Sequence, residues 1–441
     1  MNSSGNESES VLKDRSFWGM TITQFLAVFN DNFYKQTVML QCVVMEKSNP
    51  GTWKSQALAT IVFSLPFILF SGYCGFLADR YSKRTIIVLS KLAEVVIMLL
   101  AMVAFHTNHW GLMFIVLFLL GIHSTLYAPA KYGLLPELFS ENQLPKVNGL
   151  FQLSMFVAII LGIAAAGIAA ERIHTPWIVT LICMCIAGVG FLTSLLIHPT
   201  LAAHPGLKFD KSDLILNQET RKVIFADKRL LAALLATSAF WATGGMVYPQ
   251  AINEVGITQL HLNEEVTSYM AAGTGVGIAL GCIVGMIFSH GMFNARLVKF
   301  GSWGMFLGLL ALALPGELKG TFLGVGGTAS MLVWLGICAG IYNVPLQVLI
   351  QARAPEEHKG RVIGAMSLAN WVGIYFSGIL LLLIKPWLVS LHWPMNLLFG
   401  AAALFFLPII FFYRPRSENL KPYIPHGEHS DAAPMEMAKT S

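Results

Sequence analysis

A cluster of polar side chains interrupts the first long apolar stretch of the chain. Asp31 and Lys35 are four residues apart, and Asn32 and Gln36 have the same spacing, so each pair shares one face of a helix. A charge at the centre of a bilayer costs roughly 2.5–3.5 kcal/mol, so these side chains should face a protein interior and have partners there. Either Asp31 and Lys35 neutralise each other and hold helices together, or they form a patch that attracts an ammonium group at Asp31 and a phosphate at Lys35.

A second candidate site lies at the end of the fourth apolar stretch, where Lys131 and Glu137 stand among helix-breaking residues. Pro129, Gly133 and Pro136 predict a kinked and broken helix end. In membrane proteins such breaks expose backbone polar groups to a cavity. Lys131 and Glu137 would reach that cavity, or they would instead extend to the membrane surface, as long charged side chains do.

Amide side chains replace charges in the corresponding part of the second half of the chain. Asn343, Gln347 and Gln351 are spaced four residues apart and share one helix face, as do Asn148 and Gln152. Such amides often bond neighbouring helices to one another, typically with under about 1–2 kcal/mol each. We expect Asn343 and Gln347 to contact a ligand, and we favour helix–helix contact for Asn148 and Gln152.

The loop after the second apolar stretch carries a conspicuous charge pattern. Gly75 is followed by Asp79 and Arg80, and then by the basic pair Lys83 and Arg84. Asp79 can accept from backbone N–H groups at a helix start, and the basic cluster favours the cytoplasmic side. The pattern resembles the signature between the second and third helices of the major facilitator superfamily, in which the loop acts as a conformational latch. The alternative is a loop whose charges serve topology alone.

The composition requires a membrane environment. Hydrophobic residues make up 55% of the chain and charged residues 12%, against roughly 25% charged in soluble domains. A spanning helix needs about 20 predominantly apolar residues. Such stretches occur at 17–46, 56–78, 85–105, 110–131, 147–170, 175–198, 230–252, 266–289, 296–316, 326–350, 361–384 and 388–413. The sequence therefore predicts an all-α integral membrane protein with twelve transmembrane helices. The resemblance of the loop from Gly75 to Arg84 implies that these helices form two six-helix pseudo-repeats, the major facilitator fold.

The distribution of basic residues predicts the topology. With the N-terminus inside and twelve spans, 22 of the 29 Lys and Arg residues fall on the cytoplasmic side. The net charge of +5 is thus explained by topology, without nucleic-acid binding. We expect an N-terminal half at 1–198, a cytoplasmic linker at 199–229, a C-terminal half at 230–413 and a disordered cytoplasmic tail at 414–441. Both termini would be cytoplasmic.

Several functional classes find no support in the sequence. The six cysteines lie in apolar stretches and form no metal-type pair, so we expect neither a disulfide framework nor a metal site. There is no Gly-x4-Gly-Lys-[Ser/Thr] loop for ATP. His426 and Asp431 match a His-x4-Asp acyltransferase motif, which we attribute to chance because no domain surrounds it. We expect no enzyme activity and no cofactor.

Longer motifs resemble the bacterial lysophospholipid transporter family, a branch of the major facilitator superfamily. They are QFLAVFNDN at 24–32, YAPAKYGLLPEL at 127–138, VNGL at 147–150, SAFW at 238–241 and VPLQVLIQAR at 344–353. The resemblance runs through most of the chain, and the PAKYG block is its most specific part. Asn30 and Lys35 depart from the family pattern, as does Ser82, which stands where the superfamily signature usually has Gly. Lys35 adds a positive charge that the family pattern lacks, and this charge would affect which lipid headgroup the transporter prefers.

The resemblance implies that the chain moves lysophospholipids from the outer to the inner leaflet of the bacterial inner membrane, where a separate acyltransferase partner would re-acylate them. Asp31, Asn32, Lys35, Lys131, Glu137, Asn343 and Gln347 are the expected substrate contacts, and Gly75, Asp79, Arg80, Lys83 and Arg84 the expected latch. The alternative is a proton-coupled major facilitator transporter of a small solute or drug, with Asp31 or Glu137 as proton carrier. A non-transporting scaffold would not need the buried charges.

Overall fold

The protein is described by a computed structural model that covers residues 13–49, 55–139, 144–202, 206, 218–288, 292–316, 320–355 and 359–419. These residues are almost entirely helical. The two-residue strands β1 (Met292–Phe293) and β2 (Glu418–Asn419) pair antiparallel. They attach the described end of the C-terminal tail to the start of a helix.

Two sets of six long helices follow one another along the chain. The first set is α2 (Arg15–Ser48), α3 (Gln56–Arg80), α4 (Lys83–His106), α5 (Trp110–Leu138), α6 (Leu144–Arg172) and α7 (Pro176–Ser194). A short helix, α8 (Gln218–Ala226), lies within the predicted linker. The second set is α9 (Lys228–Gly245), α11 (Glu264–Ile287), α12 (Ala295–Ala313), α13 (Gly324–Arg353), α14 (Lys359–Ser390) and α15 (Leu397–Phe412).

The helices coincide with the predicted apolar stretches. Ten helices of the described residues are long and apolar enough to cross a membrane, and α15 is a shorter apolar helix. The remaining long helix, α2, carries the polar cluster around Asp31. The twelve-helix prediction is confirmed, with shifts of several residues at some boundaries: the fourth span continues to Leu138 and the seventh to Gln259. Because α14 continues to Ser390, α15 begins at Leu397 instead of near 388.

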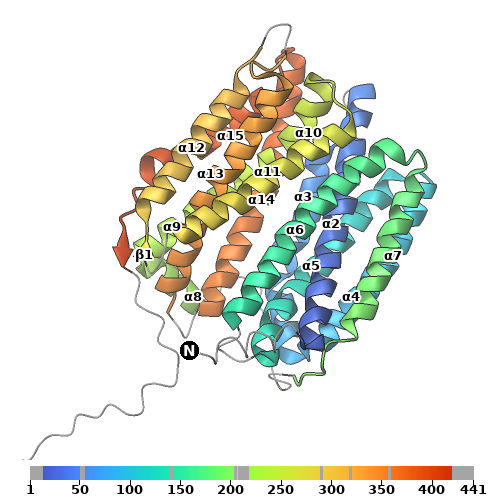
Figure 1. Cartoon of the computed structure of the whole chain (residues 1–441), viewed down its shortest axis with the longest axis vertical. Coiled ribbons are helices and arrows are strands. Elements are labelled where there is room, and N and C mark those ends of the chain that lie inside the picture. Colours follow the sequence, from blue (N-terminus) through green and yellow to red (C-terminus); the bar gives the residue numbers. More distant parts are fainter. Residues whose placement is uncertain are drawn as a thin grey trace, which may run out of the picture.

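Each half is a bundle, and the two bundles lie side by side (Figure 1). In the N-terminal bundle, α2 packs on α6 and α7, and α3 packs on α5; in the C-terminal bundle, α13 packs on α11 and α12, and α9 packs on α14. The halves meet through α6 with α11 and through α3 with α14. We call the end at which α2 begins the proximal end, and the opposite end the distal end. The described parts of both termini lie at the proximal end, the lower end in Figure 1.

Small residues allow the closest helix contact of the C-terminal bundle. A Cβ at Gly281 of α11 would lie 2.0 Å from the carbonyl oxygen of Ile337 in α13, and one at Gly336 would lie 2.2 Å from that of Thr274. No side chain fits at such distances, so these two backbones touch directly. Close packing of glycines is a recurrent means of helix association in membranes, where no hydrophobic effect drives helices together.

The seventh span is irregular. After Gly245 it continues as the π-helical segment η2 (Met246–Ala251), the single turn α10 (Ile252–Glu254) and a second π-helical segment, η3 (Val255–Gln259). Tyr248 has non-helical dihedral angles within this stretch, next to Pro249, which lacks a backbone N–H. The irregular stretch brings Asn253 and Glu254 to full burial at the distal end.

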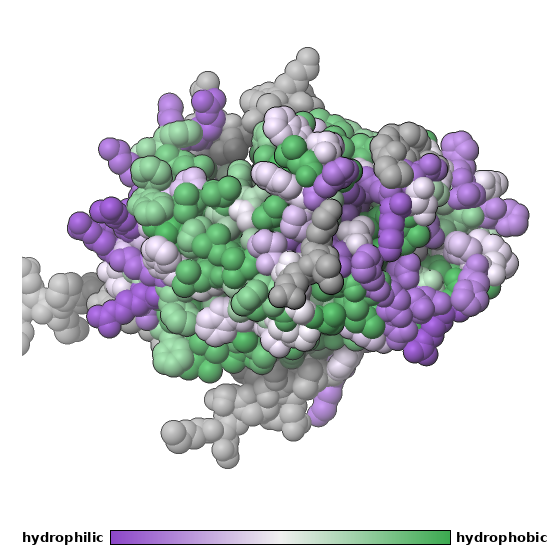
Figure 2. Space-filling model, turned by 90° about the horizontal axis from the view of Figure 1, so that it is seen from above, coloured by the Kyte–Doolittle hydropathy of each residue, from purple (hydrophilic) through white to green (hydrophobic). Residues whose placement is uncertain are grey.

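The surface of the bundle is strongly apolar along the helices. Large hydrophobic side chains are exposed on many of the spans, as expected for a surface that contacts lipid. Seen from the distal end, hydrophilic side chains gather at the rim of the molecule, with hydrophobic side chains between them (Figure 2). The chain is a multi-pass membrane protein.

Candidate functional site

Asp31 and Lys35 do not form a direct ion pair, because each turns to a different neighbouring helix. Ser124 of α5 donates its hydroxyl to Asp31 Oδ2 at 2.5 Å. Lys35 Nζ lies 5.0 Å from the centroid of the Phe63 ring in α3, a cation–π contact. The other Asp31 oxygen, Oδ1, is buried and has no hydrogen-bond partner among the described residues. An acceptor of this kind is suited to a ligand donor.

Lys131 lies near this carboxylate and is held by aromatic rings. Its Nζ is 4.8 Å from the ring centroid of Tyr132 and 5.6 Å from that of Tyr127. The residue is only 7% exposed, and its ammonium group interacts electrostatically with Asp31. Asn32, by contrast, donates to the carbonyl of Val28 in its own helix. The structure therefore brings Asp31, Lys35 and Lys131 together inside the N-terminal bundle.

A fully buried cluster of charged side chains on α4 lies close enough to Asp31 to interact with it electrostatically. The sequence analysis did not select this cluster as a site. Lys91 and Glu94 of α4 form an ion pair with no exposed surface. Asn30 donates to Glu94 Oε1 at 2.8 Å, and His123 Nε2 lies 3.4 Å from Glu94 Oε2. Both ring nitrogens of His123 lack a hydrogen-bond partner among the described residues.

One signal in the sequence points to that cluster. Lys91 and Glu94 stand three residues apart in an otherwise apolar stretch, so the argument applied to Asp31 and Lys35 applies to them as well. Their interaction with the α2 turn is a tertiary contact, because Asn30 and Glu94 are 64 positions apart. Glu94, Lys91 and Asp31 are also close enough to interact electrostatically.

Glu137 lies at the proximal end and is paired with Lys83 of the predicted latch. This contact joins α5 to the start of α4. It depends on Gly133, because a Cβ there would lie 2.7 Å from Lys83 Cε. The predicted site residue Glu137 and the predicted latch residue Lys83 thus form one ion pair, distinct from the group around Asp31.

The other residues of the predicted latch surround the junction of α3 and α4. Asp79 is exposed, and Arg80 stacks over the rings of Phe76 and Tyr81 at 5.8 and 5.6 Å. Ser82, which accepts from the backbone N–H of Thr85, caps α4. The capping role expected for Asp79 is therefore filled by Ser82.

The remaining two residues of the predicted latch are Gly75 and Arg84. Gly75 is half-buried, and a side chain there would meet nothing within 4 Å. The Nε atom of Arg84 is buried without a hydrogen-bond partner among the described residues.

The proximal end of the C-terminal bundle has its own ion pair. Asp227 caps α9 and accepts from Arg353 of α13 at 2.8 Å. Burial raises the pKa of Asp227, but hydrogen bonds from Arg353 and from backbone amides outweigh it and hold the pKa below its usual value. Asp227 therefore stays ionised at neutral pH.

The C-terminal half contributes amide side chains to the interior. Asn343 and Gln347 are half-buried on α13, and Asn343 Oδ1 is buried without a hydrogen-bond partner among the described residues. The side chains of Gln351, Asn148 and Gln152 lie outside the described part, as do His426 and Asp431 of the tail.

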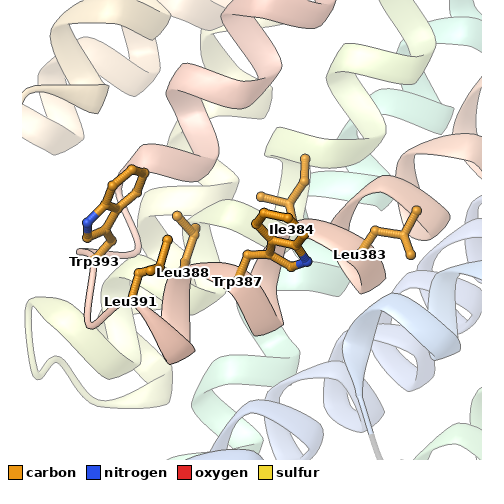
Figure 3. Close-up of a pocket in the computed structure, with 6 residues that line it drawn as sticks. All are labelled: Leu383, Ile384, Trp387, Leu388, Leu391 and Trp393. Carbon is orange, nitrogen blue, oxygen red and sulfur yellow. The ribbon is translucent and has the colours of Figure 1, made fainter.

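Surface grooves are apolar and separate from these polar groups. One, with a volume of about 480 Å³, lies at the distal end of α14 and is shown in Figure 3. It is lined by Leu383, Ile384, Trp387, Leu388, Leu391 and Trp393. A second, of about 270 Å³, lies against α2, α6 and α7 and includes Phe29, Phe33 and Arg172.

Comparison with known proteins identifies the family. The sequence profile described as Major Facilitator Superfamily matches residues 20–378. The lysophospholipid transporter LplT of Escherichia fergusonii is 26% identical over 389 residues, which is 85% of this chain and 92% of that protein. The LplT of Shigella flexneri is 26% identical over 359 residues, with 79% and 84% covered.

Solved structures share the fold. A POT family transporter in complex with 5-aminolevulinic acid superimposes with a TM-score of 0.69 at 14% identity, covering 90% of this chain and 96% of that one. A mutant of the nucleoside transporter NupG gives a TM-score of 0.65 at 12% identity, with 89% and 98% covered. The twelve-helix architecture, the two bundles and the profile match agree: this chain is a membrane transporter that belongs to the Major Facilitator Superfamily.

Proposed function

We propose that this transporter moves lysophospholipids from the outer to the inner leaflet of the bacterial inner membrane, by alternating access of the two bundles. The observation that carries the proposal is the half-buried Asp31 carboxylate, whose buried Oδ1 has no hydrogen-bond partner among the described residues, in the vicinity of Lys35 and Lys131. The similarity to proteins named lysophospholipid transporters, at 26% identity over most of the chain, supports the lipid class.

The charges of the N-terminal bundle suit a lipid headgroup. A zwitterionic headgroup carries an ammonium and a phosphate and cannot cross hydrocarbon without replacement partners. Asp31 would receive the ammonium, and Lys35 and Lys131 the phosphate. Asn32 would be a further contact there, and Glu137 a separate contact at the proximal end. Asn343 and Gln347 would contribute neutral contacts from the opposite bundle.

The acyl chain would remain near lipid throughout transport. Keeping a CH₂ group out of water is worth about 0.8 kcal/mol, so a long chain should never be exposed to water entirely. A lateral opening toward the neutral C-terminal half would let the tail stay in the bilayer while the headgroup moves. Rocking of one bundle against the other then suffices for transport.

Topology and partners follow from the same proposal. The proximal end would face the cytoplasm, with both termini and the linker at 199–229 on that side. The latch of Gly75, Asp79, Arg80, Lys83 and Arg84 would bias the equilibrium between the inward-facing and outward-facing states. A separate acyltransferase would use the delivered lysophospholipid.

The decisive experiment is lipid transport by purified protein in proteoliposomes. Lysophosphatidylethanolamine carrying a label should move between leaflets faster than in protein-free vesicles, and it should do so after the proton gradient is collapsed. The alternative is a proton-coupled transporter of a small solute, in which Asp31 or Glu137 would carry the proton. The buried groups Glu94 and His123 add further titratable side chains near Asp31. Lipid movement that stops with the gradient, or none at all, would favour that alternative.

A further inference from the structure

Three charged side chains meet where the two halves touch at the distal end. The Nζ atom of Lys385 in α14 lies 2.5 Å from Oε2 of Glu46 in α2 and 2.5 Å from Oε1 of Glu254 in α10. The side chains of Lys385 and Glu46 are 15% exposed, and that of Glu254 is fully buried. Glu46 belongs to the N-terminal half, whereas Lys385 and Glu254 belong to the C-terminal half. The lysine therefore bridges the halves.

Buried amides extend this contact across the interface. Gln36 of α2 donates to Asn253 Oδ1 at 3.0 Å. Gln56 of α3 donates to Glu254 Oε1 and to the carbonyl of Gln250, both at 2.8 Å. We call Gln36, Glu46, Gln56, Asn253, Glu254 and Lys385 the gate cluster.

The irregular seventh span contributes two of the six residues of this cluster. Asn253 and Glu254 form part of the single α-turn between the two π-helical segments. Interruptions of this kind are frequent at functional sites of helical proteins. Here the interruption places two adjacent polar residues, both with no exposed surface, against α2 and α3.

The two ends of the molecule differ in how their charges are paired. At the proximal end, the Lys83–Glu137 pair lies within the N-terminal half and the Asp227–Arg353 pair within the C-terminal half. Two ion pairs that cross between the halves, Lys385–Glu46 and Arg172–Glu265, lie at the distal end. Charged side chains thus join the two halves at this end.

We propose that the gate cluster is the lock that closes the distal end, and that opening parts Glu46 from Lys385 while Lys385 stays paired with Glu254. Lys385 and Glu254 stay together because both belong to the C-terminal bundle, whereas Glu46 belongs to the N-terminal bundle, and each bundle moves largely as one body during rocking. The C-terminal half keeps a neutral ion pair, and only the carboxylate of Glu46 is released to water. Opening therefore separates only one charged group from its partner. Separating all three charged groups from one another would leave more unpaired charges to be hydrated.

This division of the three charged residues between the bundles predicts how strongly each single substitution should open the distal end. Lys385→Met leaves two carboxylates without their cation, so it should open the lock most. Glu46→Gln removes only the charge that crosses the interface and should open it less. Glu254→Gln keeps the bond from Gln56 and leaves Lys385 with Glu46 as its one carboxylate, so it should not open the lock.

The experiment measures the separation of the two halves by pulsed electron spin resonance, in bilayer vesicles without lysophospholipid. Spin labels are placed at Thr107→Cys and Ser390→Cys, two exposed distal positions on opposite halves, after the six native cysteines are changed to Ala. Lys385→Met should shift the closed-to-open equilibrium by at least about tenfold toward the longer distance. The exchange Glu46→Lys with Lys385→Glu again gives one lysine and two carboxylates, and should restore the short distance.

The matched control is a second cross-half ion pair, Arg172 with Glu265, 3.1 Å apart. Arg172 is 69% exposed on its side chain, and exposed pairs contribute little, so Arg172→Ala should leave the distance unchanged. An unchanged distance in both Lys385→Met and Glu46→Gln, or opening by Glu254→Gln as large as that by Lys385→Met, would overturn the proposal. Should Lys385→Met fail to fold, the contrast between Glu46→Gln and Glu254→Gln decides alone. None of these readouts depends on the identity of the substrate.

Discussion

At the scale of single residues, the proposed function gives the carboxylate of Asp31 the task of distinguishing one lipid headgroup from another. Its Oδ2 accepts from Ser124, and its buried Oδ1 has no partner among the described residues. An ammonium group would satisfy that oxygen and neutralise the charge, whereas an uncharged glycerol hydroxyl would only donate a hydrogen bond. Lipids with the two headgroups should therefore depend on Asp31 to different degrees.

Asp31→Asn should reduce transport of ethanolamine-headed lysophospholipid more than that of the glycerol-headed lipid. The substitution keeps the shape and the acceptor for Ser124 but removes the charge. A hydrogen bond to a charged group contributes about 1.5–3 kcal/mol, which corresponds to roughly a 10- to 150-fold loss in transport efficiency for the ethanolamine lipid. Initial rates for both lipids in proteoliposomes measure this difference. Equal losses would show that Asp31 serves structure or proton coupling.

A second residue-scale prediction concerns the buried pair Lys91–Glu94. Lys91→Met leaves the carboxylate of Glu94 buried and uncompensated, a loss that costs about 3–5 kcal/mol of stability. Adding Glu94→Gln removes the charge and keeps an acceptor for Asn30, so it should recover part of the loss. Thermal unfolding midpoints of the variants in detergent test this. A double variant as unstable as Lys91→Met would contradict the ion-pair explanation.

At the scale of elements, the junction of α3 and α4 carries the loop that we propose as a latch, and its charged side chains differ in how they are held. Lys83 is anchored on Glu137, and Arg80 on two aromatic rings, whereas Asp79 is exposed at the end of α3. An exposed carboxylate in an otherwise anchored loop is free to change partners between conformations.

Asp79→Asn should therefore lower the transport rate several-fold and leave lysophospholipid binding nearly unchanged. A latch biases the equilibrium between two states and makes no contact with the ligand. Initial transport rates and equilibrium binding, measured on the same preparation, separate the two effects. Loss of binding without a change in the conformational distribution would instead place Asp79 in the substrate site.

At the scale of the whole molecule, the even number of spans puts the described parts of both termini at one end of the bundle. Basic residues concentrate toward this end, which favours the cytoplasm. A reporter fused after Ser441 should accordingly read out as cytoplasmic. A reporter inserted at position 108, in the distal connection between α4 and α5, should read out as external. A periplasmic readout at Ser441 would contradict the proposed topology.

The sequence alone determined the number and position of the spanning helices. The length of an apolar stretch is a local property, and a bilayer of fixed thickness converts it directly into a helix. The main error was at the last boundary, where α14 continues to Ser390. No charged residue marks that turn between residues 386 and 396, so hydropathy did not locate it.

Polar candidates within spans were also predictable, because a buried charge in lipid is costly wherever it occurs. This reasoning selected Asp31, Lys35 and Lys131, and applied fully it would have selected Lys91 and Glu94. Their roles remain predictions. Sequence spacing relates residues only within one helix, so it suggested Lys35 as the partner of Asp31, whereas the structure supplies Ser124 from another helix.

Only the tertiary structure decided which charges face each other across the molecule. Glu46 and Lys385 are 339 positions apart, and each looks like an ordinary charge near a span end. Glu254 entered no prediction, because it stands at the end of a span whose π-helical course the hydropathy pattern does not reveal. Their meeting depends on how α2, α10 and α14 pack at the distal end. That packing is a property of the two assembled halves, and no local pattern encodes it.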